Sequence, residues 1–166
     1  MSEEIDVLDE EGKIAGRVSR EEAHEKGLRH RTVVLLLFDL KGNVFLQKRA
    51  SWKKYFGGRW EFSAGGHLEA GEGEEEGIRK EAGEEIGVGK LELEKIGEEE
   101  VDVRIGEIHN REIVSVFKAV SDTGVVIDGE EVEEGEFWEI GDLKKAIKER
   151  QEEFTPLLVK CVEKYL

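Results

Sequence analysis

The stretch from Gly65 to Val88, GGHLEAGEGEEEGIRKEAGEEIGV, most limits what this chain can fold into. It holds eight glutamates and seven glycines. Apolar residues recur within it every four positions, at Ile78, Ala82 and Ile86. This spacing predicts a helix over residues 73–86 with one inward stripe, which Gly87 would end. The glycines before the helix predict a loop whose backbone can approach a metal or a phosphate closely.

Three glutamates would share one face of this helix. Glu84 and Glu85 follow Glu81 by three and four positions, so their Cβ atoms lie within about 6 Å of one another. Like charges placed in this way destabilise an isolated helix, and a divalent cation with oxygen ligands removes the conflict. A solvated acidic face is the alternative, and we interpret residues 74–76 in that way. Glu72 would lie near the helix N-terminus, where a negative charge is favourable.

The rest of the chain predicts a single α/β domain over residues 1–166. Strands are expected at 4–9, 14–19, 31–39, 44–49, 60–64, 91–97, 100–108, 111–120 and 133–140. A capping box, Ser19 to Glu22, begins a short helix that Gly27 ends. Two more helices are expected, over 141–151 and from Pro156 after Thr155. Such an order favours a mixed sheet with helices on its faces.

The chain is strongly acidic, with a formal net charge of -15. A nucleic-acid partner is therefore not expected, because phosphate backbones require a basic face. A small phosphate substrate remains compatible, since a divalent metal can reverse the local sign. The longest apolar run, VVLLLF, is too short to span a membrane, and the first residues lack the apolar core of a signal peptide. We therefore expect a cytoplasmic protein without a membrane partner.

The 66–88 pattern resembles the Nudix box. The matching residues are Gly66, Glu72, Glu81, Ala82, Glu84, Glu85, Gly87 and Val88, with Lys80 in place of the usual arginine. The resemblance runs from about Arg31 to Leu143. It implies the Nudix α/β/α sandwich with a mixed central sheet. It also implies metal-dependent hydrolysis of a diphosphate linkage, in a nucleoside diphosphate derivative or a related organic diphosphate.

The Nudix resemblance also implies roles for individual residues. Glu81, Glu84 and Glu85 would be catalytic and, with the carbonyl of Gly65, would hold Mg²⁺ or Mn²⁺. The general base remains open, because the family varies in which glutamate serves; the candidates outside the box are Glu131, Glu133, Glu134 and Glu136. Arginine can bind a carboxylate through two parallel hydrogen bonds, and lysine cannot. Lys80 therefore leaves the orientation of Glu81 open. It also keeps a non-catalytic diphosphate-binding module among the alternatives.

The residues around the box are similar to the type-1 isopentenyl-diphosphate isomerases, which share the Nudix fold. Those enzymes carry a cysteine where this chain has Gly65, and they have a degenerate second half of the box. Both differences favour the hydrolytic, isomerase-like branch, of which YfcD-type proteins are an example. Isomerase activity is the alternative. The same resemblance offers a second set of metal ligands, His30, His67 and Glu112, with His24 nearby.

A basic and aromatic segment precedes the box. Arg49, Lys53, Lys54 and Arg59 are expected to bind the phosphates of a small-molecule diphosphate substrate. A basic surface loop is the alternative interpretation. Oligomeric state is open, and the chain could act as a homodimer.

Overall fold

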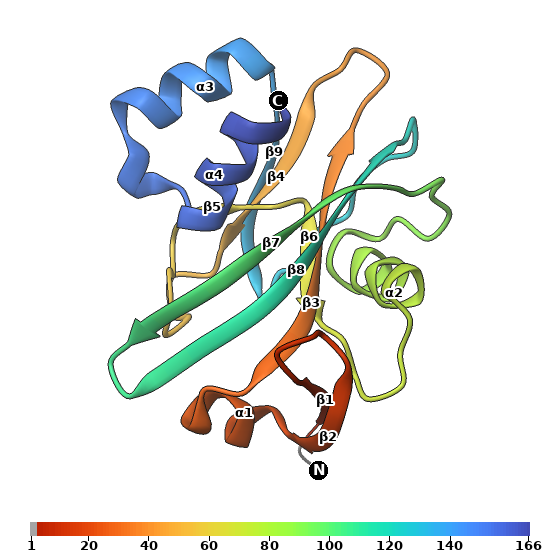
Figure 1. Ribbon diagram of the computed structural model, residues 1–166. Helices are drawn as coiled ribbons and strands as arrows, with labels where there is room; N and C mark the ends of the chain where they lie inside the picture. The colour runs from red at the N-terminus through yellow and green to blue at the C-terminus, as the bar shows by residue number, and fades with distance from the viewer. Residues whose placement is uncertain (1–2) are drawn as a thin grey trace.

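The structure is a computed structural model that describes residues 3–166. Within this range nine strands form one sheet and four α-helices pack around it (Figure 1). The strands are β1 (Glu4–Leu8), β2 (Ile14–Ser19), β3 (Arg29–Phe38), β4 (Val44–Arg49), β5 (Trp60–Glu61), β6 (Ala64–His67), β7 (Glu94–Ile105), β8 (Ile108–Val120) and β9 (Val132–Trp138). The helices are α1 (Arg20–Lys26), α2 (Glu74–Ile86), α3 (Ile140–Glu149) and α4 (Pro156–Tyr165), and a 3-10 turn spans Gln151–Glu153.

Strand β3 is the centre of the sheet. It pairs in parallel with β8 along its whole length, and antiparallel with β1, β6 and β4. Strand β4 in turn pairs with β5 and β9, and β8 pairs with β7. The sheet is therefore mixed, as the sequence predicted.

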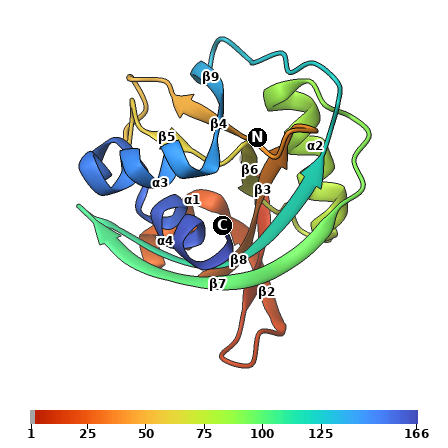
Figure 2. The same cartoon turned by 90° about the horizontal axis from the view of Figure 1, so that it is seen from above.

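Helices cover both faces of the sheet because successive side chains of a strand point to opposite sides. Val33, Leu35 and Leu37 pack with the inward stripe of α2. Leu36 and the partly buried Val34 pack with α3 and α4 on the other face. Figure 2 shows β7 and β8 curving around α4, with α2 on the opposite face of the sheet. The predicted α/β/α sandwich with a mixed central sheet is thus confirmed.

Local signals account for the ends of the helices. The Ser19 side chain accepts a hydrogen bond from the backbone N–H of Glu22, and Gly27 ends α1 in the left-handed conformation. Gly87 ends α2 in the same way, at a φ of 67°. Among residues 3–166, none of the helices is both long enough and apolar enough to cross a bilayer.

Two predicted elements differ from the structure. Gly65 and Gly66 belong to strand β6 and not to a loop, because β6 pairs with β3 from Thr32 to Leu35. The three strands expected between residues 91 and 120 are two long ones, β7 and β8. The break in alternation near Gly97 is an irregularity in the β7–β8 register and not the end of a strand.

Candidate active site and metal centre

The site forms where the sheet divides. Strands β3 and β4 pair only at Leu37 and Phe38, and then separate. The chain after β5 leaves β4 at Ser63 and joins β3 as β6. The Ser63 hydroxyl accepts from the N–H of Leu37 and donates to the carbonyl of Phe45, which holds the crossing in place. Side chains from α2 and β4 meet beside this division.

Glu85 of α2 reaches the edge of β6. Its Oε2 accepts two hydrogen bonds, from Gln47 Nε2 at 2.9 Å and from the backbone N–H of Gly65 at 3.1 Å. Burial nevertheless raises the pKa of Glu85 to about 8, against these two hydrogen bonds, and the charges of Glu81 and Glu61 add to the effect. Burial therefore disfavours the anionic form of Glu85, and a cation bound beside it would stabilise that form.

Glu81 lies one helical turn earlier, against the next residue of β6. A Cβ added to Gly66 would lie 2.6 Å from the carboxyl carbon of Glu81, so only glycine lets this carboxylate approach the strand. Burial, together with the charge of Glu84, raises the pKa of Glu81 to about 7. Glu84 itself is exposed. The structure therefore brings the three box glutamates to one region beside Gly65 and Gly66, and their mutual repulsion fits a divalent cation.

Lys80 contacts the loop before the helix and not Glu81. Its ammonium lies 2.9 Å from Glu72 and 3.4 Å from Glu69. The Glu72 side chain is only 8% exposed, so the pair ties the start of the box to its second helical turn. Lys80 thus forms an ion pair with Glu72, although lysine lacks the bidentate guanidinium of the usual arginine.

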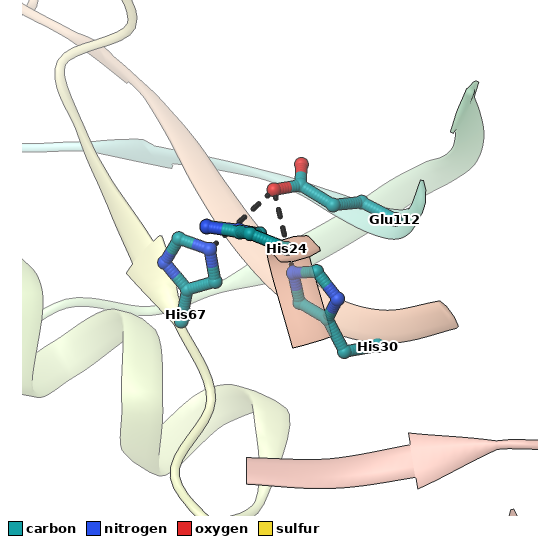
Figure 3. A group of neighbouring side chains, drawn as sticks. All are labelled: His24, His30, His67 and Glu112. Atoms are coloured by element: carbon teal, nitrogen blue, oxygen red, sulfur yellow. Dashed lines mark ion pairs between the residues drawn. The ribbon is translucent and has the colours of Figure 1, made fainter. Parts of the chain in front are cut away.

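A second group of side chains converges on the other side of β6, because His67 follows Gly66 and points the opposite way. His24 comes from α1, His30 from β3, His67 from β6 and Glu112 from β8 (Figure 3). One ligand atom of each lies within 4.8 Å of all the others. The strand register explains this, since β3 pairs His30 with Glu112 on one side and Thr32 with His67 on the other.

One ring nitrogen of each histidine in this cluster lacks a hydrogen-bond partner. The His30 ring bonds the Leu28 carbonyl through Nδ1 at 2.9 Å, which leaves Nε2 as the free lone pair. The Nε2 atoms of all three histidines are buried without a hydrogen-bond partner, and two of them lie 3.5–3.6 Å from Glu112. Lone pairs and a carboxylate that face one another in this way fit a bound divalent metal.

Titration favours the ligand forms of these groups. Burial, with the nearby His67 and His30, lowers the pKa of His24 to about 4, and burial also lowers the pKa of His67. Burial opposes ionisation of Glu112, but the facing rings of His67 and His30 outweigh it and hold its pKa well below the usual range. Neutral imidazoles and an ionised carboxylate are what a metal requires. His24, which the sequence placed only nearby, belongs to the set.

The predicted substrate-binding residues lie at the end of β4, where Arg49 is the last residue, and in the segment between β4 and β5. Arg49 donates to Glu61 at 2.7 Å, and Lys53 lies 3.5 Å from Glu131. Within the described residues 3–166, Lys54 and Arg59 form no ion pair with a carboxylate. Each lies over a neighbouring aromatic ring, Tyr55 and Phe56 respectively. These two cations are therefore the ones available to a ligand.

The pairing of β9 with β4 shows on which face of the sheet two of the candidate general bases lie. Glu134 and Glu136 lie opposite Lys48 and Leu46, and Leu46 packs with α3 and α4. These two carboxylates therefore project from the face opposite Gln47 and Glu85.

Sequence reasoning missed two polar residues on the Glu85 side. Gln47 and Glu61 are cross-strand partners, so they share that face. The signal for Glu61 was a polar residue between the apolar Trp60 and Phe62, whereas Gln47 is the first of three polar residues that end β4.

Comparison with known proteins agrees with this geometry. The model of the NUDIX domain matches residues 28–158, so the chain belongs to the Nudix family. The uncharacterised Nudix hydrolase PA4841 of Pseudomonas aeruginosa is 34% identical over 136 residues, which cover 82% of this chain and 78% of that protein. The isopentenyl-diphosphate Δ-isomerase of Rhodobacter capsulatus is 35% identical over 153 residues, covering 89% and 85%.

These relatives confirm the predicted resemblance to isomerase-like Nudix proteins, and hydrolases named YfcD are also similar to the chain. Among solved structures, DR0079 of Deinococcus radiodurans superposes with a TM-score of 0.80 at 21% identity, over 99% of this chain and all of that one. Because the hydrolase and the isomerase are equally similar in sequence, identity alone does not separate the two activities.

Proposed function

We propose that the protein is a divalent-metal-dependent hydrolase that cleaves a diphosphate linkage, in a nucleoside diphosphate derivative or a related organic diphosphate. One observation carries the proposal. Helix α2 brings Glu81 and Glu85 against the backbone of Gly65 and Gly66, and Glu84 is close enough for its charge to act on Glu81. Membership of the Nudix family supports it.

Glu81, Glu84, Glu85 and the Gly65 carbonyl would hold Mg²⁺ or Mn²⁺. When bound, such an ion supplies charge neutralisation for the diphosphate and a more acidic water. The carboxylates of the site would orient a water molecule and accept a proton from it. Lys54 and Arg59 would bind the outer phosphate oxygens and set the position of the substrate. The strongly acidic surface elsewhere would restrict anion binding to this basic segment.

A panel of nucleoside and isoprenoid diphosphates, assayed with Mg²⁺ and with Mn²⁺, tests the proposal. We expect release of phosphate or of a monophosphate from at least one class. Glu84→Gln and Glu85→Gln should lower kcat by two or more orders of magnitude, with an unchanged circular dichroism spectrum. A panel without turnover, or variants as active as the wild type, would refute the hydrolase assignment.

Isopentenyl-diphosphate isomerisation is a second candidate, which the cluster of His24, His30, His67 and Glu112 favours. Gly65 counts against it, because glycine offers neither an acid nor a base where the isomerases carry a cysteine. Incubation with isopentenyl diphosphate, with detection of dimethylallyl diphosphate, distinguishes the two candidates.

A further inference from the structure

We propose that Gln47 is a positioning residue that holds the carboxyl group of Glu85 in one orientation toward the metal and the substrate. This inference rests on the proposed function and deepens it. Gln47 lies on β4, is 7% exposed, and reaches across the division of the sheet to α2. Its role would be exerted through Glu85, without contact to the substrate.

The direction of the Gln47 amide follows from its neighbours. Its nitrogen lies 2.9 Å from Glu85 Oε2 and 3.3 Å from the Ser63 carbonyl oxygen. Both neighbouring atoms are acceptors, so the NH₂ group must face them, and its two hydrogens satisfy one each. The reverse orientation would place the amide oxygen against a carboxylate. Gln47 therefore acts as a donor to Glu85.

Both donors bind the same oxygen of Glu85. Gln47 and the Gly65 N–H both engage Oε2, while no hydrogen bond from the described residues 3–166 engages Oε1. A free glutamate carboxyl rotates broadly about its last side-chain bond. Two donors fixed to separate strands, β4 and β6, remove that freedom. Oε1 is thereby left as the oxygen presented to a ligand.

This arrangement also accounts for a buried glutamine at this position of β4. Phe45, two residues earlier on the same face, packs against α2 with apolar side chains. An apolar residue at position 47 would extend that core but would leave Oε2 with one donor. Groups that orient a metal ligand commonly contribute tenfold to hundredfold in metal affinity. We expect an effect of that size from Gln47.

Mn²⁺ titration of the purified protein, followed by electron paramagnetic resonance without substrate, tests the inference. The site is defined as the Mn²⁺ binding step that the wild type shows and that Glu85→Gln lacks. Gln47→Met keeps the side-chain volume and removes the donor, so it should weaken that step about tenfold to hundredfold. Gln47→Leu is the second variant, should the methionine variant fold poorly. A metal-free crystal structure of either variant should show the Glu85 carboxyl turned away from the Gly65 N–H.

Ser63→Ala is the matched control. It removes a buried hydroxyl from the same crossing, but its side chain bonds Leu37 and Phe45 and not Glu85. It should lower thermal stability while leaving Mn²⁺ affinity within about twofold. Equal losses in Ser63→Ala and Gln47→Met would mean that Gln47 has only a structural role. Unchanged affinity in Gln47→Met, or no Glu85-dependent step in the wild type, would also overturn the inference. Glu85-dependent binding without turnover of any diphosphate would refute the proposed function alone.

Discussion

The backbone of Gly65 packs so closely on Val33 that a Cβ at residue 65 would lie 2.8 Å from the Val33 carbonyl oxygen. Side-chain carbons do not approach a backbone oxygen this closely without a shift of one strand. Gly65 pairs directly with Val34, so β3 and β6 would have to separate at the site itself. The space that a cysteine needs in the isomerase-like reaction is therefore missing here, as well as its thiol.

Gly65→Cys should consequently fail to produce an isomerase. The added side chain should cost about 1–3 kcal/mol of unfolding free energy through overpacking. Urea denaturation measures the loss, and conversion of isopentenyl diphosphate to dimethylallyl diphosphate measures the activity. Gly83→Cys is the control, because a Cβ at Gly83 meets open space. A stable Gly65→Cys protein with isomerase turnover would show that the steric argument is mistaken.

Spacing along the chain was sufficient to predict the box helix, the order of the elements predicted a mixed sheet with helices on its faces, and the resemblance to the Nudix box predicted the particular fold. Ile78, Ala82 and Ile86 are all fully buried, as their four-residue spacing indicated. The contacts within the site could not be predicted in this way, because they depend on which strands of the sheet separate from each other. Glu85 meets Gln47 only because β4 leaves β3 at Phe45, and no local pattern records that division. The same holds for His24, whose place beside His67 depends on how α1 packs on the sheet.

Lys80 should be important for stability through Glu72. Lys80→Met leaves a carboxylate that is 8% exposed without its closest cation, which should cost about 2 kcal/mol. Lys80→Arg should stay within about 0.5 kcal/mol of the wild type, because the guanidinium can reach the same carboxylate. Urea unfolding of both variants at neutral pH provides the measurement. If Lys80→Met were as stable as Lys80→Arg, the ion pair would not support the box.

The histidine cluster should bind a divalent metal independently of the box. At a Mn²⁺ or Zn²⁺ concentration about 100-fold above Kd, binding should add about 2.7 kcal/mol, and so raise Tm by roughly 5–10 °C. Glu112→Gln should abolish most of this rise, whereas Glu85→Gln should retain it. His109→Gln changes the fourth histidine, which bonds Asp102 on the β7–β8 hairpin, and serves as the control. An identical rise in Glu112→Gln would place the metal elsewhere.

Glu99 should make the attachment of α4 to β7 dependent on pH. The hydrogen bond from Lys164, opposed by burial and supported by those from Tyr165 and Lys160, lowers the pKa of Glu99 to about 2. An unfolded glutamate titrates near 4.5. Because the folded pKa is the lower one, the contribution is complete above pH 4.5 and is lost as pH falls toward 2.

The comparison of wild type with Glu99→Gln isolates this contribution from that of other carboxylates. Their difference in unfolding free energy should be about 1–2 kcal/mol at pH 7, reduced by the exposure of the two lysines, and should shrink steadily below pH 4.5. Urea unfolding between pH 3 and pH 7 measures it. Glu163→Gln, on the exposed face of α4, should show no such trend. A Glu99→Gln difference that stayed constant down to pH 3 would mean that the buried carboxylate is not held in its charged form by these three donors.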